Sequence, residues 1–107
     1  MPKYLIQASY TAEGLKGVQK DKASGRKAAT IKAVESVGGK MESFYYALGP
    51  DDVVIIVDLP DNVSAAALSV TASASGLIHS KTTTLLSVKE VDNALAKRVI
   101  FQAPGRG

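Results

Sequence analysis

An unbroken apolar run near the middle of the chain constrains the fold more than any other feature of the sequence. The run VVIIV at residues 53–57 lies between Asp52 and Asp58 and shows no alternation of apolar and polar residues. Neighbouring residues of a strand point to opposite faces of its sheet, so this strand has apolar side chains on both faces. A chain of 107 residues has few helices with which to cover both faces. We therefore expect helices on one face and a second copy of the chain on the other.

The rest of the hydrophobic pattern predicts a strand, a helix, two strands, a helix, a strand and a final helix. The first helix is best supported over 23–37, since Gly14 and Gly17 weaken a helix before it and Gly38-Gly39 is a stop signal. Strands show alternating apolar and polar residues or are rich in β-branched and aromatic residues. On these criteria we expect strands over about 3–10, 40–48, 52–59 and 77–86.

Two later helices carry start signals. Asp61 or Asn62 can cap the second helix, which ends at Gly76. Its buried face is expected to be mostly alanine, from the three-and-four spacing of Val63, Ala66, Ala67, Val70 and Ala74. The third helix begins with the capping-box spacing of Ser87 and Glu90 and is expected to reach roughly Phe101. We expect one domain over 1–101 and a disordered tail over 102–107.

The element order predicts an α+β fold of the ferredoxin-like type, βαββαβ with an extra C-terminal helix. Right-handed crossovers place four strands in an antiparallel sheet with both main helices on one face. The first and third strands are central, and they are the two with apolar residues on both sides. The helix-free face is then partly apolar, which favours a homodimer or higher homo-oligomer.

Residues 48–61, LGPDDVVIIVDLPD, resemble the signature of the GYD-domain family, and the similarity extends over about residues 1–95. It includes MPKY at 1–4, Gly38-Gly39, and TTL at 83–85 before VKE at 88–90. Gly49 and Asp52 stand at the Gly and Asp of the motif, whereas Asp51 replaces its Tyr, so no role of that ring carries over. The resemblance implies a small bacterial protein without an established function, related in shape to dimeric α/β barrels. It supplies no catalytic residues.

The net charge, the cysteine content and the length of the apolar stretches limit the kinds of partner that the chain can have. The net charge is +3, but the lysines of residues 16–32 are interrupted by Asp21 and accompanied by no aromatic residue, so we expect a solvated helix face and no specific nucleic-acid partner. The absence of cysteine excludes disulfides and thiolate metal sites. No apolar stretch has membrane-spanning length, and the opening MPK lacks the layout of a signal peptide. A cytoplasmic protein without a membrane partner is expected.

Chemical motifs are sparse, and the hairpin is interpreted as structural. Asp51 and Asp52 are adjacent carboxylates in the predicted loop, where backbone hydrogen bonding explains them better than acid–base work. Gly49 precedes Pro50, which predicts a backbone angle or close approach that a Cβ would obstruct. We predict no catalytic residue, no metal site and no cofactor.

A binding pocket is a more open hypothesis. His79 is the only histidine, and it fits a partly exposed or packed strand residue better than a base or a haem ligand, because no second metal-binding partner is present. Glycines near basic residues at 14–17 and 24–27 are ordinary loop glycines or an anion site. A speculative small-molecule pocket combines polar-tipped strand residues with one arginine: Gln7, Tyr10, Arg26, Tyr45 and His79.

Two function classes remain open from the sequence. The first is an oligomeric small-molecule-binding or regulatory module without catalysis, which needs no catalytic constellation. The second is a cofactor-independent oxygenase or isomerase of the dimeric α/β-barrel type, with His79 or a tyrosine acting on an activated substrate. The second rests on fold analogy alone. A cavity lined by His79 would favour it, and a solvent-facing His79 would disfavour it.

Overall fold

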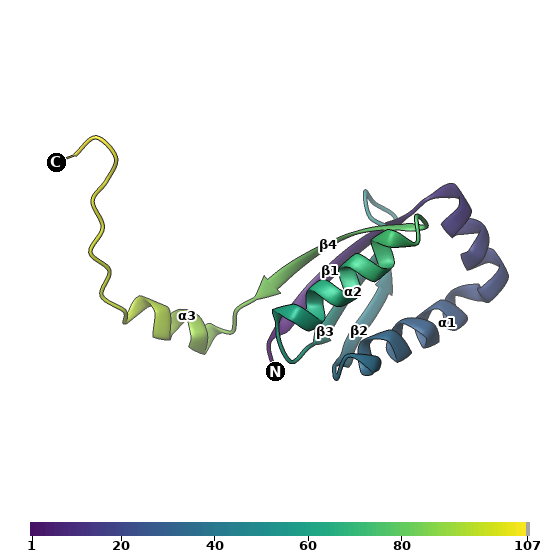
Figure 1. Ribbon diagram of the computed structural model, residues 1–107, viewed down its shortest axis with the longest axis horizontal. Helices are drawn as coiled ribbons and strands as arrows, with labels where there is room; N and C mark the ends of the chain where they lie inside the picture. Colours follow the sequence, from purple (N-terminus) through teal and green to yellow (C-terminus); the bar gives the residue numbers. More distant parts are fainter. Residues whose placement is uncertain (107) are drawn as a thin grey trace.

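The computed structural model describes residues 1–106, which form a four-stranded sheet and three helices (Figure 1). The predicted order of elements is confirmed. The strands are β1 (Lys3–Tyr10), β2 (Lys40–Tyr46), β3 (Val53–Asp58) and β4 (Ile78–Leu85), and the helices are α1 (Ala12–Ser36), α2 (Asn62–Ala74) and α3 (Val88–Leu95). Residues 102–106 contain neither helix nor strand, and Gly107, the end of the expected disordered tail, lies outside the described residues.

The sheet is antiparallel throughout, with the strand order β2-β3-β1-β4. On the two central strands Tyr4 stands opposite Val57, and on the other side of β1 it stands opposite Thr84. The register of β2 shifts between Met41 and Ser43, so that Glu42 is an extra residue in this edge strand. The α+β architecture is consistent with the ferredoxin-like arrangement.

Alternation along the strands divides the sheet into two faces. The covered face carries the buried side chains of Tyr4, Ala8, Val53, Ile55 and Val57, which pack with Val34 of α1 and Ala65 of α2 in one core. Both main helices therefore lie on this face. The other face, called the open face below, carries the alternate residues, among them Leu5, Gln7, Tyr45, Val54, Ile56, His79, Lys81 and Leu85.

The predicted buried face of α2 is wrong. Val63 is 77% exposed and Val70 is 67% exposed, whereas Ala65 is buried and Leu68 and Ala72 are half-buried. Small or apolar residues occur all around this helix, so their spacing does not define one face. The helix start is as predicted, because Asp61 is the N-cap and its carboxylate accepts a hydrogen bond from Ser64 N at 2.8 Å.

Helix α1 begins earlier than its most secure predicted part and is bent in the middle. Thr11 is the N-cap, and its hydroxyl accepts a hydrogen bond from Gly14 N at 3.2 Å. Gly14 is buried, and a Cβ there would collide with the carbonyl oxygen of Leu77, so glycine is required at this position. Lys22 has φ 68° and ψ 163°, a conformation that a non-glycine residue rarely adopts, and it separates two helical segments.

Gly38 has the predicted role of a helix stop, whereas the close approach expected at Gly49 lies at Gly39. Gly38 adopts a positive φ of 81° at the end of α1, as a helix stop requires. A Cβ on Gly39 would lie 2.6 Å from the carbonyl oxygen of Asp58 and 2.6 Å from Leu59 Cδ2. The reason predicted for Gly49 is wrong, since its φ is not positive and a Cβ would have no neighbour within 4 Å.

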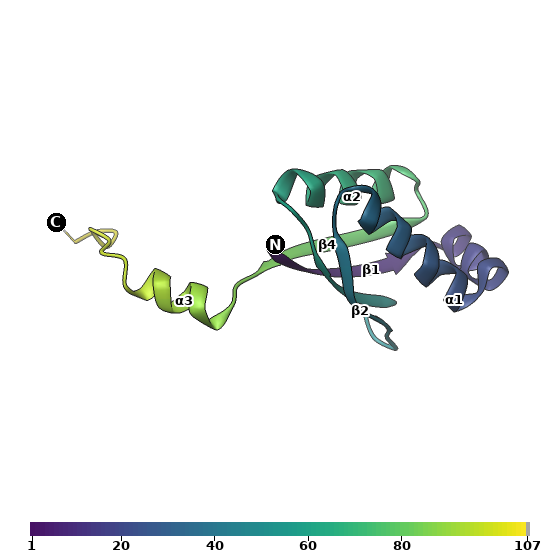
Figure 2. The same ribbon diagram turned by 90° about the horizontal axis from the view of Figure 1, so that it is seen from below.

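Helix α3 is shorter than predicted and stands apart from the domain (Figure 2). It ends at Leu95 rather than near Phe101, although the predicted capping box of Ser87 and Glu90 is present. The residues after Leu95 include Pro104 and Gly105 and do not continue the helical turn. The C-terminal end of the chain consequently lies far from the sheet (Figures 1 and 2).

Candidate binding cavity

A cavity of about 380 Å³ lies between the covered face of the sheet and the two main helices. Helix α1 packs mainly on β2 and helix α2 packs mainly on β4. The two helices therefore lie over the two edge strands, with the gap between them above the central strands. Small side chains line the gap on both helices, for example Ala29 and Ala33 on α1 and Ala72 on α2, beside larger ones such as Arg26 and Leu68. The small residues leave space above the central strands.

The cavity is apolar over most of its surface. Ile6 and Ala8 of β1 and Val53 and Ile55 of β3 line it from the sheet, and Phe44 adds an aromatic ring from β2. Phe44 is fixed by an edge-to-face contact with Tyr46, whose ring centroid lies 5.2 Å away. Such a surface fits the apolar part of a small molecule.

Polar groups gather where β1 and β2 end. Tyr10 and Arg26 both line the cavity, and Arg26 Nη1 lies 3.7 Å from Asp21 Oδ2. Residues five apart do not face each other on a regular helix, so this ion pair depends on the bend at Lys22. At 3.7 Å the pair is loose, which leaves guanidinium donors free for another acceptor.

Tyr46 connects this polar group to the bent helix. Its hydroxyl donates a hydrogen bond to the carbonyl oxygen of Ala23 at 3.1 Å, one residue after the bend. Burial raises the pKa of the Tyr46 hydroxyl, the charge of the nearby Tyr10 adds to the rise, and Arg26 opposes it. The Tyr46 hydroxyl is therefore influenced electrostatically by both Tyr10 and Arg26.

Ser80 provides an unsatisfied polar atom on the cavity wall. Its side chain lies on the covered side of β4, opposite Ala8, and lines the cavity. Within residues 1–106 its buried Oγ has no hydrogen-bond partner. A buried hydroxyl without a partner is unfavourable, so this atom is available to a ligand or to water.

The structure divides the five residues of the predicted pocket between the two faces. Tyr10 and Arg26 line the cavity together. Gln7, Tyr45 and His79 belong to the open face, where Gln7 is half-buried and the other two are exposed. Ser80 and Asp21 were missed. Ser80 has one sequence signal, because it shares the strand parity of Ile78, whereas nothing in the sequence indicated Asp21, which lies beside the bend that the structure shows at Lys22.

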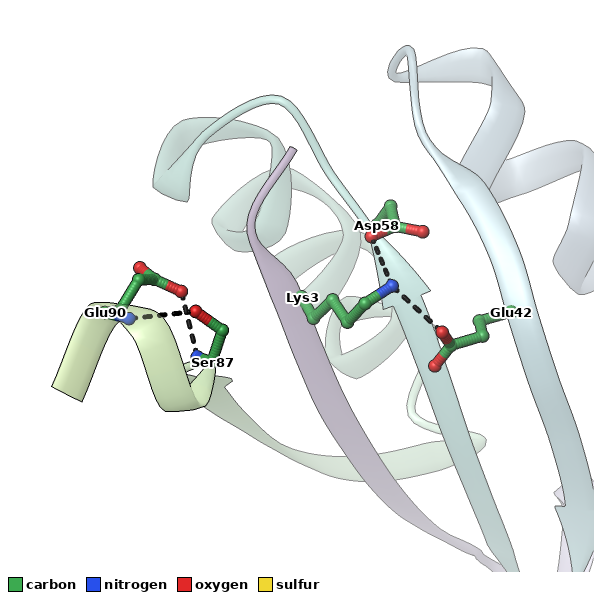
Figure 3. Close-up of polar contacts among 5 residues, drawn as sticks. All are labelled: Lys3, Glu42, Asp58, Ser87 and Glu90. Carbon is green, nitrogen blue, oxygen red and sulfur yellow. Dashed lines mark hydrogen bonds and ion pairs between the residues drawn. The ribbon is translucent and has the colours of Figure 1, made fainter. Parts of the chain in front are cut away.

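The open face combines apolar residues with ion pairs at its two ends. At one end Lys3 Nζ lies 2.9 Å from Asp58 Oδ1 and 2.9 Å from Glu42 Oε1 (Figure 3). The hydrogen bonds to Asp58 and then Glu42 raise the pKa of Lys3. The middle of the face, with Leu5 and Ile56, carries no charge.

The hairpin aspartates act as acceptors for neighbouring strands. Asp52 Oδ2 accepts a hydrogen bond from Tyr10 N at 2.9 Å, and this contact joins the hairpin to the end of β1. Asp51 accepts from Ser9 Oγ at 3.3 Å and pairs with Lys81 Nζ at 3.3 Å. Both carboxylates are thus engaged in contacts that hold the loop on the sheet.

Across positions 1–106 no three His, Cys, Asp or Glu side chains are grouped so that they could hold a metal ion. In the same part of the chain no helix has both the length and the apolar character needed to cross a membrane.

The comparison with known families decides the relationship. The family model of the GYD domain matches residues 4–95. The chain belongs to the GYD-domain family. No curated protein and no solved structure matches it. In this GYD protein the match covers β2, β3, β4 and all of β1 except Lys3, and it ends at the last residue of α3.

Proposed function

We propose that this GYD protein is a binding module for a small, mainly apolar molecule and that it works without catalysis. The observation that supports the proposal is the cavity of about 380 Å³, which is apolar over most of its surface and has a few polar groups at one end. Volume and composition are those of sites that hold small organic ligands. The unpartnered Ser80 Oγ supplies a hydrogen-bonding group that the fold itself does not use.

The ligand of this proposal has an apolar body and an anionic end. The body lies over Ile6, Ile55 and Phe44, and the anionic group lies against Arg26. An arginine side chain forms strong paired hydrogen bonds with a carboxylate. Asp21 is the present partner of Arg26, and its side chain is 47% exposed, so a ligand carboxylate replaces it at little cost in burial.

The proposed module is a homo-oligomer, with a dimer as the simplest form. Val54 and Ile56 of the central strand β3 stay only half-buried on the open face, since both main helices lie on the other side. Leu5 and Leu85 extend this apolar area across the neighbouring strands. A second copy that places its own open face there covers both areas at once.

The enzymatic alternative receives less support from the geometry. His79 is exposed and lies on the open face, away from the cavity on the covered face. A general base must lie within hydrogen-bonding reach of the proton that it takes. A tyrosine mechanism retains Tyr10, which lines the cavity, but no base or acid partner accompanies it apart from the pair of Arg26 and Asp21.

The proposal is tested with two probes that share an eight-carbon chain, octanoate and octanol. Each is titrated into the protein, and amide shifts are followed by two-dimensional NMR. We expect saturable shifts at Ile6, Ala8 and Ser80 with both probes. Octanoate should bind roughly tenfold more tightly, because a hydrogen bond to a charged group contributes about 1.5 kcal/mol.

Matched variants locate the site. Arg26→Gln should remove the preference for octanoate, while Lys27→Gln, which deletes the neighbouring exposed charge, should keep it. Ala29→Phe should fill the cavity and weaken both probes. Absence of saturable binding at millimolar probe, or binding that is unchanged by Ala29→Phe, would contradict the proposal.

A further inference from the structure

The C-terminal arm, defined as residues 86–101, exposes more large apolar side chains than any segment of comparable length in the domain. It leaves the end of β4 and runs away from the sheet and from both main helices (Figures 1 and 2). Leu95 and Phe101 are each 77% exposed. The large apolar residues of the arm, all exposed, are Leu86, Val88, Val91, Leu95, Val99, Ile100 and Phe101.

The helix inside this arm needs a partner. Helix α3 has eight residues, and an isolated helix shorter than about 12 residues is marginal in water. Its start is well formed, because Ser87 Oγ accepts from Glu90 N at 3.0 Å and Glu90 Oε1 accepts from Ser87 N at 2.9 Å (Figure 3). Val88, Val91 and Leu95 share one side of the helix, which therefore has an apolar stripe that no residue among 1–106 covers.

The open face has a matching exposed area at its far end. The arm starts beside Lys3, whereas Tyr45 and Leu48 lie at the opposite end of the sheet, near the hairpin. Tyr45 is 69% exposed and Leu48 is fully exposed. Asp51 and Asp52 lie at this end too but are engaged within the domain, so the two regions match through their exposed apolar area.

We propose that two copies of the chain exchange C-terminal arms, with the arm of each copy packed on Tyr45 and Leu48 of the other. The inference rests on the proposed self-association through the open face. Two sheets that meet face to face with their strands in opposite directions bring the end of β4 in one copy to the hairpin end of the other sheet, and the arm then crosses from the β4 edge toward Tyr45 on β2. An arm that projects beyond its own sheet then meets the second copy.

The area of the arm is sufficient for this role. Seven apolar side chains of this size bring on the order of 500 Å² to the contact, against the roughly 800 Å² per partner of a standard interface. The open face supplies the remainder. The exchange also gives α3 the tertiary contact that its length requires.

Cross-linking tests the exchange directly, because the chain contains no cysteine. A full-length Leu95→Cys chain is mixed with a full-length Tyr45→Cys chain, and a short bismaleimide is added. We expect a cross-linked mixed dimer. In the control, the Leu95→Cys chain is mixed with a Lys27→Cys chain, whose thiol lies on exposed α1, and no mixed dimer should form.

Two further measurements separate the possible failures. The double variant Tyr45→Cys, Leu95→Cys is diluted and cross-linked, and a bridge within one chain would overturn the exchange, because the arm would then fold onto its own sheet. Sedimentation velocity of the unmodified chain reports the assembly. A monomer at all concentrations would overturn both the self-association and the exchange. A dimer without the Leu95-to-Tyr45 cross-link would overturn the exchange alone.

Discussion

Adding a single methyl group at Gly39 should destabilise the protein far more than adding one at Gly49. A Cβ on Gly39 meets the Asp58 carbonyl oxygen and Leu59 Cδ2 at 2.6 Å, and each must move by roughly 0.8 Å to reach an ordinary contact. Neither can move freely. Leu59 is fully buried, and Asp58 is held in the ladder between Lys3 and Lys40.

The magnitude follows from overpacking. Forcing a methyl group into a packed site costs about 1 to 3 kcal/mol, and we expect the upper end because one obstacle is backbone. Gly49→Ala meets no atom within 4 Å, and it reduces the freedom of the unfolded chain, so it should stabilise by about 0.5 kcal/mol.

The assay is urea unfolding at one protein concentration, monitored by circular dichroism. Gly39→Ala should lower the midpoint by roughly 1 to 2 M urea relative to Gly49→Ala. The two variants differ only in the position of one methyl group. If the free energy of unfolding of Gly39→Ala lies within about 0.5 kcal/mol of that of the unmodified chain, the space around Gly39 at the end of β3 does not restrict the side chain there, and the reasoning is refuted.

Three other variants address the bend, the open face and the helix caps. Lys22→Gly should stabilise the protein by about 1 kcal/mol in the same urea assay, because glycine adopts φ 68° without strain; a loss of stability would show that the Lys22 side chain matters more. Ile56→Lys should abolish self-association in sedimentation velocity or prevent folding, whereas Lys27→Gln on the outer side of α1 should leave assembly unchanged; a folded Ile56→Lys dimer would place the interface elsewhere. Asp61 accepts a hydrogen bond from Ser64 N, which lowers the pKa of the Asp61 carboxyl group. The stability that this cap contributes is therefore present above the ordinary carboxyl pKa of about 4 and is lost as the pH falls through the lowered value. The stability difference between the unmodified chain and Asp61→Ser, which keeps a cap that does not titrate, should therefore shrink on acidification, and a difference that is constant with pH would rule this linkage out.

Features set by a few neighbouring residues were predictable from the sequence. The bounds of β1, the cap at Asp61 and the capping box at Ser87 are all confirmed, because each depends on alternation or on a side chain three residues from its partner. Of the five residues predicted for the pocket, Tyr10 and Arg26 line the same cavity.

Features set by packing between distant segments were not predictable. Spacing selected the wrong face of α2, since apolar residues surround that helix and only its position over β4 decides which are buried. Glycine beside proline indicated a constraint at Gly49, while the constraint lies at Gly39, where α1 meets Asp58 and Leu59. The cavity depends on the distance between α1 and α2, and this distance cannot be predicted from a single sequence.

The bulge at Glu42 has a consequence for how copies of this protein can join. Edge strands of a sheet present unpaired backbone groups that recruit further strands and produce open-ended fibres. An extra residue in β2 breaks the regular spacing of those groups along this edge, and the pairing of Glu42 with Lys3 holds a charge beside it. The opposite edge strand, β4, carries Lys81. Growth by strand addition is disfavoured at both edges, so a polymer that extends the sheet is not expected.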